Sequence, residues 1–81
     1  MAERQKHIYV KDYQDIIIRE FAIRTKRKQK VYYQMALDEF ISNHSKEIQE
    51  QGINSNFLTK ELKKGQLEEI PLKIKELFEL N

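Results

Sequence analysis

The chain has 81 residues, no cysteine and a formal net charge of +2. A chain of this length forms one small domain that buries only roughly 60% of its unfolded surface, so additional support is expected. The absence of cysteine excludes disulfides and thiolate metal sites, and the two histidines, His7 and His44, are too few and too far apart to suggest a zinc site. We expect no metal and no cofactor, and we expect dimerisation to supply the stability.

No apolar run of the sequence approaches the roughly 20 residues that span a membrane. The charged start, residues 1–6, lacks the apolar core of a signal peptide. We therefore expect a soluble, cytoplasmic protein with no membrane partner.

Charge is distributed unevenly along the chain. Residues 1–37 carry nine basic and four acidic side chains, a balance of +5, whereas residues 38–81 carry six basic and nine acidic side chains, a balance of −3. Positive charge concentrated on one part of a protein attracts phosphates without regard to base sequence. Alternatively, these basic side chains form nothing more than a solvated face.

The first predicted element is a strand over residues 6–10, where polar and apolar side chains alternate. Ile8 and Val10, two positions apart, are expected to face a core. The outward face then holds Gln5, His7 and Tyr9. The opposite register, shifted by one residue, would bury His7 and Tyr9 instead. Because a lone strand leaves its N–H and C=O groups unpaired, we expect it to pair with the same strand of a second copy.

Two helices are predicted next, separated by the basic connection Lys26–Lys30. Asp12 is the expected N-cap of the first helix, which ends near Thr25. The second helix is expected from Gln29 to Asn43. The apolar positions of the first helix are Tyr13, Ile17, Ile18, Phe21 and Ala22. Those of the second are Val31, Tyr32, Met35, Ala36, Leu37, Phe40 and Ile41. The wider apolar face of the second helix suits packing against both the first helix and a partner chain.

Short amphipathic helices are predicted beyond His44. Residues 45–51 either continue the second helix or form a short third one, and Gly52 ends it. Asn54 is the expected N-cap of a further helix that stops at Gly65.

A last helix is predicted to run to Leu80. It starts either at Leu67, with a disturbance at Pro71, or at Pro71 itself as a first-turn proline. Helices shorter than roughly 12 residues are marginal alone in water, so these helices are expected to bury their apolar stripes against another surface.

The strand, the two helices and the basic turn together make this segment resemble the ribbon-helix-helix family of DNA-binding proteins. Family members commonly show the pattern Ala-x-x-Thr-Gly-x-Ser-x-Ser-x-Leu-Ile-x-x-Ala-Leu-x-x-Tyr/Phe. The positions that correspond to it here are Ala22, Thr25, Lys26, Lys28, Lys30, Tyr32, Tyr33, Ala36, Leu37 and Phe40. Lysines stand where the family has Gly and Ser, and the resemblance covers about half of the chain. A lysine at position 26 must either accept a left-handed conformation or avoid it.

The resemblance implies a mainly α fold, a homodimer joined by an intermolecular two-stranded antiparallel β-ribbon, with short C-terminal helices added. Residues 1–44 would form the DNA-binding and dimerisation domain, and residues 45–81 a helical extension. The ribbon would enter the major groove. The implied base contacts are Gln5, His7 and Tyr9. The implied phosphate contacts are Lys6, Lys11, Arg27, Lys28, Gln29 and Lys30. The implied dimer core is Ile8, Val10, Ile18, Phe21, Tyr32, Met35, Ala36 and Phe40.

These residues also have simpler interpretations. Tyr9 alternatively packs as a strand aromatic, and His7 alternatively occupies a strand edge without contacting DNA. The basic connection alternatively is a solvated loop. No nucleophile and base are placed together by the sequence, so we expect no enzymatic activity.

The predicted function is that of a sequence-specific repressor that binds double-stranded DNA, is associated with a nucleoid or plasmid, and assembles as a dimer or a dimer of dimers on repeated half-sites. Plasmid, mobile-element and viral settings all fit, as does a plasmid partition or conjugation accessory protein. One alternative is an antitoxin whose residues 45–81 bind a toxin. The same residues alternatively fold as a cap on the second helix. A further alternative is a helical interaction module with no role in nucleic-acid binding.

Overall fold

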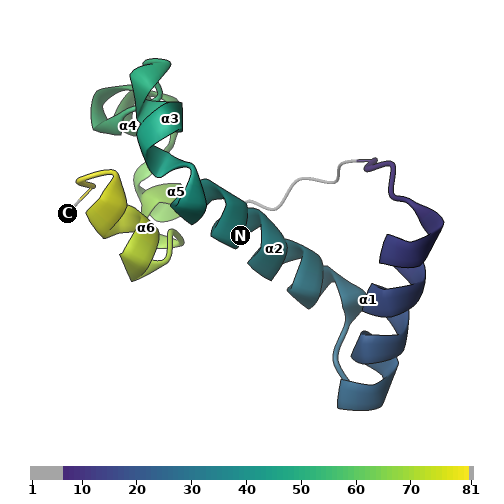
Figure 1. Cartoon of the computed structure of the whole chain (residues 1–81). Coiled ribbons are helices and arrows are strands. Elements are labelled where there is room, and N and C mark those ends of the chain that lie inside the picture. Colours follow the sequence, from purple (N-terminus) through teal and green to yellow (C-terminus); the bar gives the residue numbers. More distant parts are fainter. Residues whose placement is uncertain (1–6, 81) are drawn as a thin grey trace. The chain divides into compact units, whose positions relative to one another are not determined.

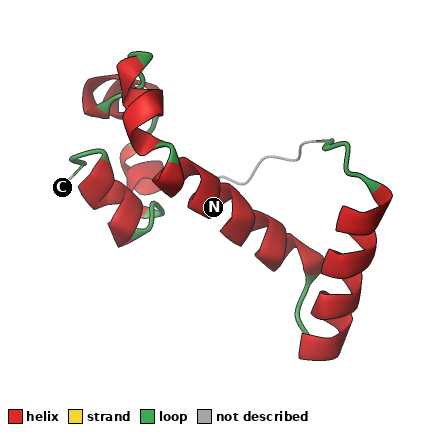
Figure 2. Ribbon diagram, viewed as in Figure 1, coloured by secondary structure: helices red, strands yellow, loops and turns green. Residues whose placement is uncertain are grey.

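The computed structural model describes residues 7–80, and all the regular structure in this range is helical (Figures 1 and 2). The helices are α1 (Asp12–Thr25), α2 (Gln29–Asn43), α3 (Ser45–Glu50), α4 (Ser55–Glu61), α5 (Lys64–Glu68) and α6 (Leu72–Leu77). The first two are the longest, with 14 and 15 residues. No helix among these residues is long and apolar enough to cross a membrane.

The prediction of a β-strand at the start of the chain is wrong for the residues that the structure describes. Residues 7–10 belong to no helix and to no strand (Figure 2). A strand exists only where its N–H and C=O groups pair with a neighbouring strand, and residues 7–80 contain no strand that offers this pairing. The ribbon-helix-helix architecture, which requires the strand, is therefore corrected to an all-helical fold.

The chain divides into two compact units, with the boundary between residues 37 and 38, inside α2. We call the described residues 7–37 the amino-terminal unit and residues 38–80 the carboxyl-terminal unit. The boundary also separates the charges, because the amino-terminal unit carries seven basic against three acidic side chains and the carboxyl-terminal unit six against nine. The units therefore have formal charges of +4 and −3.

α1 begins at Asp12, one residue earlier than predicted, because the predicted N-cap at Asp12 would make Tyr13 the first helical residue. Lys11 takes the N-cap position, and Asp12 becomes the first helical residue. The side-chain oxygen of Gln14 accepts a hydrogen bond of 2.9 Å from the backbone N–H of Lys11. Asp12 and Asp15 bring negative charge to the first turn, where it complements the helix dipole.

α1 ends at Thr25, as predicted, in a turn centred on Lys26. Lys26 adopts the left-handed conformation, with φ 58° and ψ 40°. Its N–H donates to the Ile23 carbonyl at 3.2 Å, and the N–H of Arg27 donates to the Ala22 carbonyl at 2.9 Å. This pair of bonds is a Schellman motif, which helices normally close with glycine. The lysine thus accepts the strained conformation.

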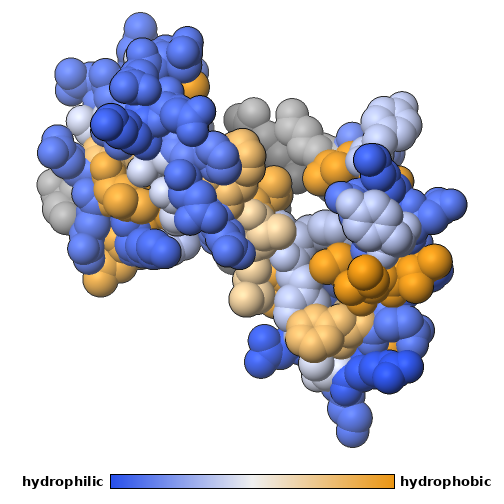
Figure 3. All heavy atoms as spheres, viewed as in Figure 1, coloured by the Kyte–Doolittle hydropathy of each residue, from blue (hydrophilic) through white to orange (hydrophobic). Residues whose placement is uncertain are grey.

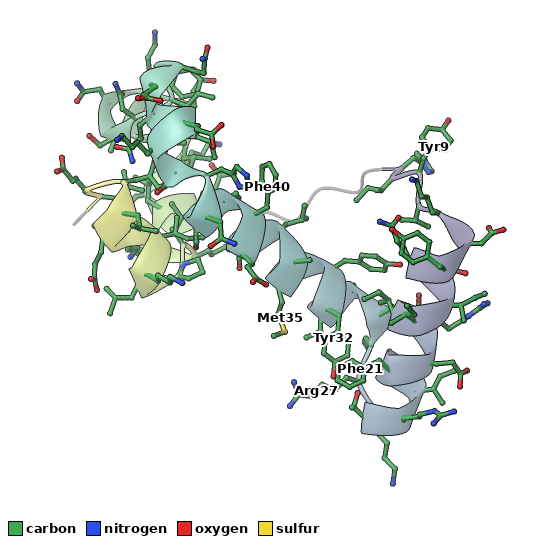
Figure 4. All side chains as sticks on the ribbon, in the orientation of Figure 1. Tyr9, Phe21, Arg27, Tyr32, Met35 and Phe40 are labelled. Carbon is green, nitrogen blue, oxygen red and sulfur yellow. The ribbon has the colours of Figure 1, made fainter. Side chains whose placement is uncertain are left out.

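Aromatic and hydroxyl contacts join α1 to α2 within the amino-terminal unit. The rings of Phe21 and Tyr32 lie 4.9 Å apart between centroids, pointing toward each other (Figure 4). The Tyr32 and Thr25 hydroxyls are hydrogen-bonded at 2.7 Å. Ala22, 2% exposed, is the one buried residue among those described in this unit. The contact between the two helices is therefore real but small.

In the carboxyl-terminal unit, residues 45–50 form a separate short helix and do not continue α2. Gly52 follows α3 with φ 87°, and the Asn54 side chain caps α4 by accepting a 3.1 Å hydrogen bond from the N–H of Phe57. Both roles agree with the sequence prediction. Gly65 does not stop a helix, because α4 already ends at Glu61 and Gly65 lies inside α5.

The last helix is α6, preceded directly by Pro71 in the N-cap position. Of the two predicted starts, Pro71 is thus closer than Leu67 to the first residue of α6, Leu72. Ile74 and Phe78, 7% and 3% exposed, are the buried residues of this unit among those described. The Gln49 side chain donates a 3.1 Å hydrogen bond to the Leu77 carbonyl and so ties α3 to α6. The carboxyl-terminal helices therefore pack on one another around a small core.

Candidate nucleic-acid interface

The basic connection between α1 and α2 is the most cationic segment of the described chain. Lys26, Arg27 and Lys28 are consecutive and exposed, and Lys30 follows in the first turn of α2. Among the described residues, no acidic group forms an ion pair with Lys26, Arg27 or Lys28. By contrast, Arg24, at the end of α1, lies 3.4 Å from Glu20. The three consecutive cations are thus available to a ligand.

The position of these cations is electrostatically unfavourable for the protein alone. They lie at the N-terminal end of a 15-residue helix whose first turn holds no acidic residue. That end of a helix carries partial positive charge and N–H groups without helical partners. Cations there repel the helix dipole, whereas a phosphate would satisfy both the dipole and the side chains. The geometry favours an anionic ligand.

The expected base contacts are only partly described. Gln5 lies outside the described residues. His7 and Tyr9 lie in the segment before α1 and are exposed, Tyr9 completely so (Figure 4). Because no strand forms over residues 7–10, the expected presentation of His7 and Tyr9 on a β-ribbon is wrong.

The expected phosphate contacts do not form one cluster in a single copy. Lys6 lies outside the described residues. Arg27, Lys28, Gln29 and Lys30 are adjacent, as predicted. Lys11, at the opposite end of α1, lies about 20 Å away along a helix that rises 1.5 Å per residue. Lys26 is not among the predicted contacts, although its place beside Arg27 makes it part of the same cluster.

Most of the expected dimer-core side chains are exposed in the single chain. Ile18 and Tyr32 are half-buried within the amino-terminal unit, and Ala36 is exposed. The large exposed members are Ile8 at 58%, Val10 at 40%, Phe21 at 51%, Met35 at 54% and Phe40 at 58%. Phe40 falls in the carboxyl-terminal unit, where its ring stacks on His44 at 4.1 Å between centroids. Apolar exposure on this scale is typical of a surface that another protein covers.

The described residues hold no group of three His, Cys, Asp or Glu side chains arranged to bind a metal ion. No protein-family model, no curated protein and no solved structure matches the chain. The candidate interface therefore rests on the charges and geometry of the chain itself.

Proposed function

We propose that this chain is a homodimeric regulator that binds double-stranded DNA and contacts its phosphates through the basic connection between α1 and α2. One observation carries the proposal: three exposed consecutive cations, without ion-pair partners in the described part of the chain, lie at the positive end of α2. DNA offers a dense array of phosphates to such a cluster. In a cell the protein would accordingly be found with the nucleoid or a plasmid.

A second copy serves both stability and binding. The amino-terminal unit buries one residue among those described, which is too little apolar burial for an independent fold. Pairing covers exposed apolar side chains such as Phe21 and Met35 and doubles the number of phosphate contacts. A two-fold dimer also matches a DNA site that is repeated about its own two-fold axis. His7 and Tyr9 remain our candidates for base contacts, now as exposed side chains before α1.

The carboxyl-terminal unit fits a cap better than a segment that orders on a toxin. Ile74 and Phe78 are buried within the unit, and the bond from Gln49 to Leu77 joins two of its helices. A segment that awaits a partner would leave such side chains uncovered. Rapid proteolysis of residues 45–81 in the isolated protein would instead favour the antitoxin alternative.

The phosphate contact is tested by the salt dependence of binding to a labelled DNA duplex. For B-DNA, each phosphate that the protein neutralises contributes about 0.9 to the steepness of log K against log salt concentration. Two copies with three cations each would neutralise about six phosphates and weaken on the order of 1,000-fold in affinity between 50 and 200 mM salt. Lys28→Asp should flatten the slope and weaken all duplexes alike.

The matched control is Lys60→Asp, which changes charge equally at an exposed position of α4. Lys28→Asp should also stabilise the fold by about 1 kcal/mol, because an aspartate before α2 can cap the helix and complement its dipole. Weaker binding together with a higher melting temperature would show that Lys28 serves the ligand and not the fold. Absence of binding at low salt, or equal effects of the two variants, would refute the proposal.

A further inference from the structure

α1 carries apolar side chains on the side that packs on α2 and also on the opposite side. Ala22, 2% exposed, marks the side toward α2. With 3.6 residues per turn, seven residues of α1 lie at least 100° around the helix axis from Ala22. One of them, Phe21, contacts Tyr32 of α2 with its ring, which leaves six. These residues, which we call the outer face of α1, are Tyr13, Ile16, Ile17, Glu20, Ile23 and Arg24. A helix that carries apolar side chains beyond the side that packs on its neighbour normally buries them against another surface.

The apolar side chains of the outer face are uncovered in the single chain. Their exposed fractions are 59% for Tyr13, 51% for Ile16, 60% for Ile17 and 62% for Ile23. Orange, hydrophobic atoms are accordingly visible on the surface over α1 (Figure 3). Isolated exposed apolar residues need no explanation, but four on one helical face indicate an interface.

The charges of the outer face select its occupant. It holds one acid and one base, Glu20 and Arg24, which pair with each other at 3.4 Å. A neutral face attracts neither a polyanion nor an anionic lipid surface. The acidic groups of the first turn, Asp12 and Asp15, lie less than 100° around the helix from Ala22 and so outside this face, and Asp15 pairs with Arg19 at 3.4 Å. A second α1 lying antiparallel places the positive end of each helix dipole beside the negative end of the other, so a neutral, apolar copy of the same face is its best complement.

The area available on the outer face reaches the lower limit for a specific contact. If each apolar side chain of the outer face exposes a little over half of about 180 Å², the four contribute roughly 400 Å² per copy. Two copies then bury roughly 800 Å², and the stems of Glu20 and Arg24 between them bring the total to about 1,000 Å², the lower limit for a specific interface.

We propose that two copies of this chain pair through the outer faces of α1, antiparallel and about a two-fold axis. Such a contact is isologous, with the same residues supplied by both copies. It uses none of the cations of the basic connection and therefore does not rest on DNA binding. It also does not include Met35 on α2, which belongs to the pairing surface described under the proposed function. A chain that uses both pairing surfaces would assemble four copies.

Cross-linking tests the pairing and its direction. Because the chain lacks cysteine, each introduced thiol is the only one present. Glu20→Cys lies near the middle of the outer face, where the two-fold axis brings equivalent residues together, and should form a disulfide-linked pair under mild oxidation. Tyr13→Cys lies at one end and should pair poorly with itself, but it should cross-link with Arg24→Cys when the two variants are mixed.

The control thiol is Asn56→Cys, at an exposed position of α4. Glu20→Cys cross-linking no faster than Asn56→Cys would overturn the proposed pairing. Efficient self-linking of Tyr13→Cys would overturn its antiparallel direction, because only a parallel pair brings the two ends together.

The mass of the assembly gives an independent test. One chain has a mass of 9.8 kDa, so two copies have 19.6 kDa and four have 39.2 kDa. Ile17→Glu should at least halve the mass measured by light scattering, whereas Asn56→Glu, which adds the same charge elsewhere, should leave it unchanged. A monomeric parent protein, or an Ile17→Glu variant with the parent mass, would overturn the proposal. The cysteine variants retain Ile17 and so report on the contact even if Ile17→Glu fails to fold.

Discussion

Replacing Lys26 by glycine should stabilise the chain. Lys26 closes α1 with φ 58° and ψ 40°, the left-handed conformation in which Cβ approaches the following carbonyl oxygen. For an L-residue this conformation costs roughly 1–2 kcal/mol, and glycine avoids the cost. The two backbone bonds of the turn, from Lys26 to Ile23 and from Arg27 to Ala22, do not involve the side chain and would persist.

The net gain is smaller than the strain that is relieved. Glycine also has more conformational freedom in the unfolded chain, which offsets roughly 0.5–1 kcal/mol. We therefore expect Lys26→Gly to raise the free energy of unfolding by about 0.5–1 kcal/mol. For a chain of this size that corresponds to a rise in melting temperature of roughly 3–6 °C.

Lys26→Ala is the control that separates the effect of backbone strain from the effect of the lost side-chain charge. It removes the same cation as Lys26→Gly but keeps Cβ and hence the strain. Melting curves followed by circular dichroism in the far ultraviolet should therefore rank the glycine variant above the alanine variant, while both bind DNA with the same reduced affinity. Equal melting temperatures for the two variants, at equal protein concentration, would refute the strain argument.

Three further substitutions test the local interactions. Gly52→Ala should lower the free energy of unfolding by about 1 kcal/mol, because its φ of 87° suits only glycine although nothing lies within 4 Å of an added Cβ; urea titration measures the change. Asn54→Ala should cost about 1 kcal/mol by removing the cap of α4, whereas Asn54→Asp should retain most of it, as judged by the urea midpoint. Tyr32→Phe should lower the free energy of unfolding by about 0.5 kcal/mol, because it removes the hydrogen bond to the Thr25 hydroxyl. Tyr33→Phe is the control, and equal stabilities of the two variants would show that this bond contributes nothing.

The sequence predicts those elements whose signals are local. The bounds of α2, Gln29–Asn43, and the end of α1 at Thr25 follow from helical periodicity and the polar connection, and the structure confirms them. The roles of Gly52 and Asn54 are predictable as well, because positive φ and side-chain capping have strong residue preferences.

The errors concern features that depend on distant partners. Alternation of Ile8 and Val10 indicates a strand only if another strand is present to pair with it, and none is found in the described residues. The glycine at position 65 predicts a helix stop, yet α4 already ends at Glu61 and the half-buried Leu62 takes an extended conformation, with φ −107° and ψ 143°. The extended backbone at Leu62 therefore ends α4 before the glycine is reached.

The candidate interface is predictable in composition but not in geometry. The sequence identifies the basic connection Lys26–Lys30 and leaves open whether Lys26 adopts the left-handed conformation, and the structure shows that it does. The predicted apolar stripe of the first helix includes Tyr13 and Ile17, which the structure leaves 59% and 60% exposed, and it omits Ile16 and Ile23. Plotting Ile16 and Ile23 around a helical wheel would show the apolar outer face of α1.

If the chain binds DNA as proposed, the cations at the start of α2 link the occupancy of the DNA-binding surface to the lifetime of the protein. A protein that repels its own helix dipole when free, and is relieved of that repulsion when a phosphate binds, unfolds less often in the bound state. Ligand at about 100 times its dissociation constant adds roughly 2.7 kcal/mol to the free energy of unfolding. Proteases act on the unfolded population, so copies without DNA would be degraded first. Under the proposed DNA binding, the number of protein molecules would in this way follow the number of DNA sites.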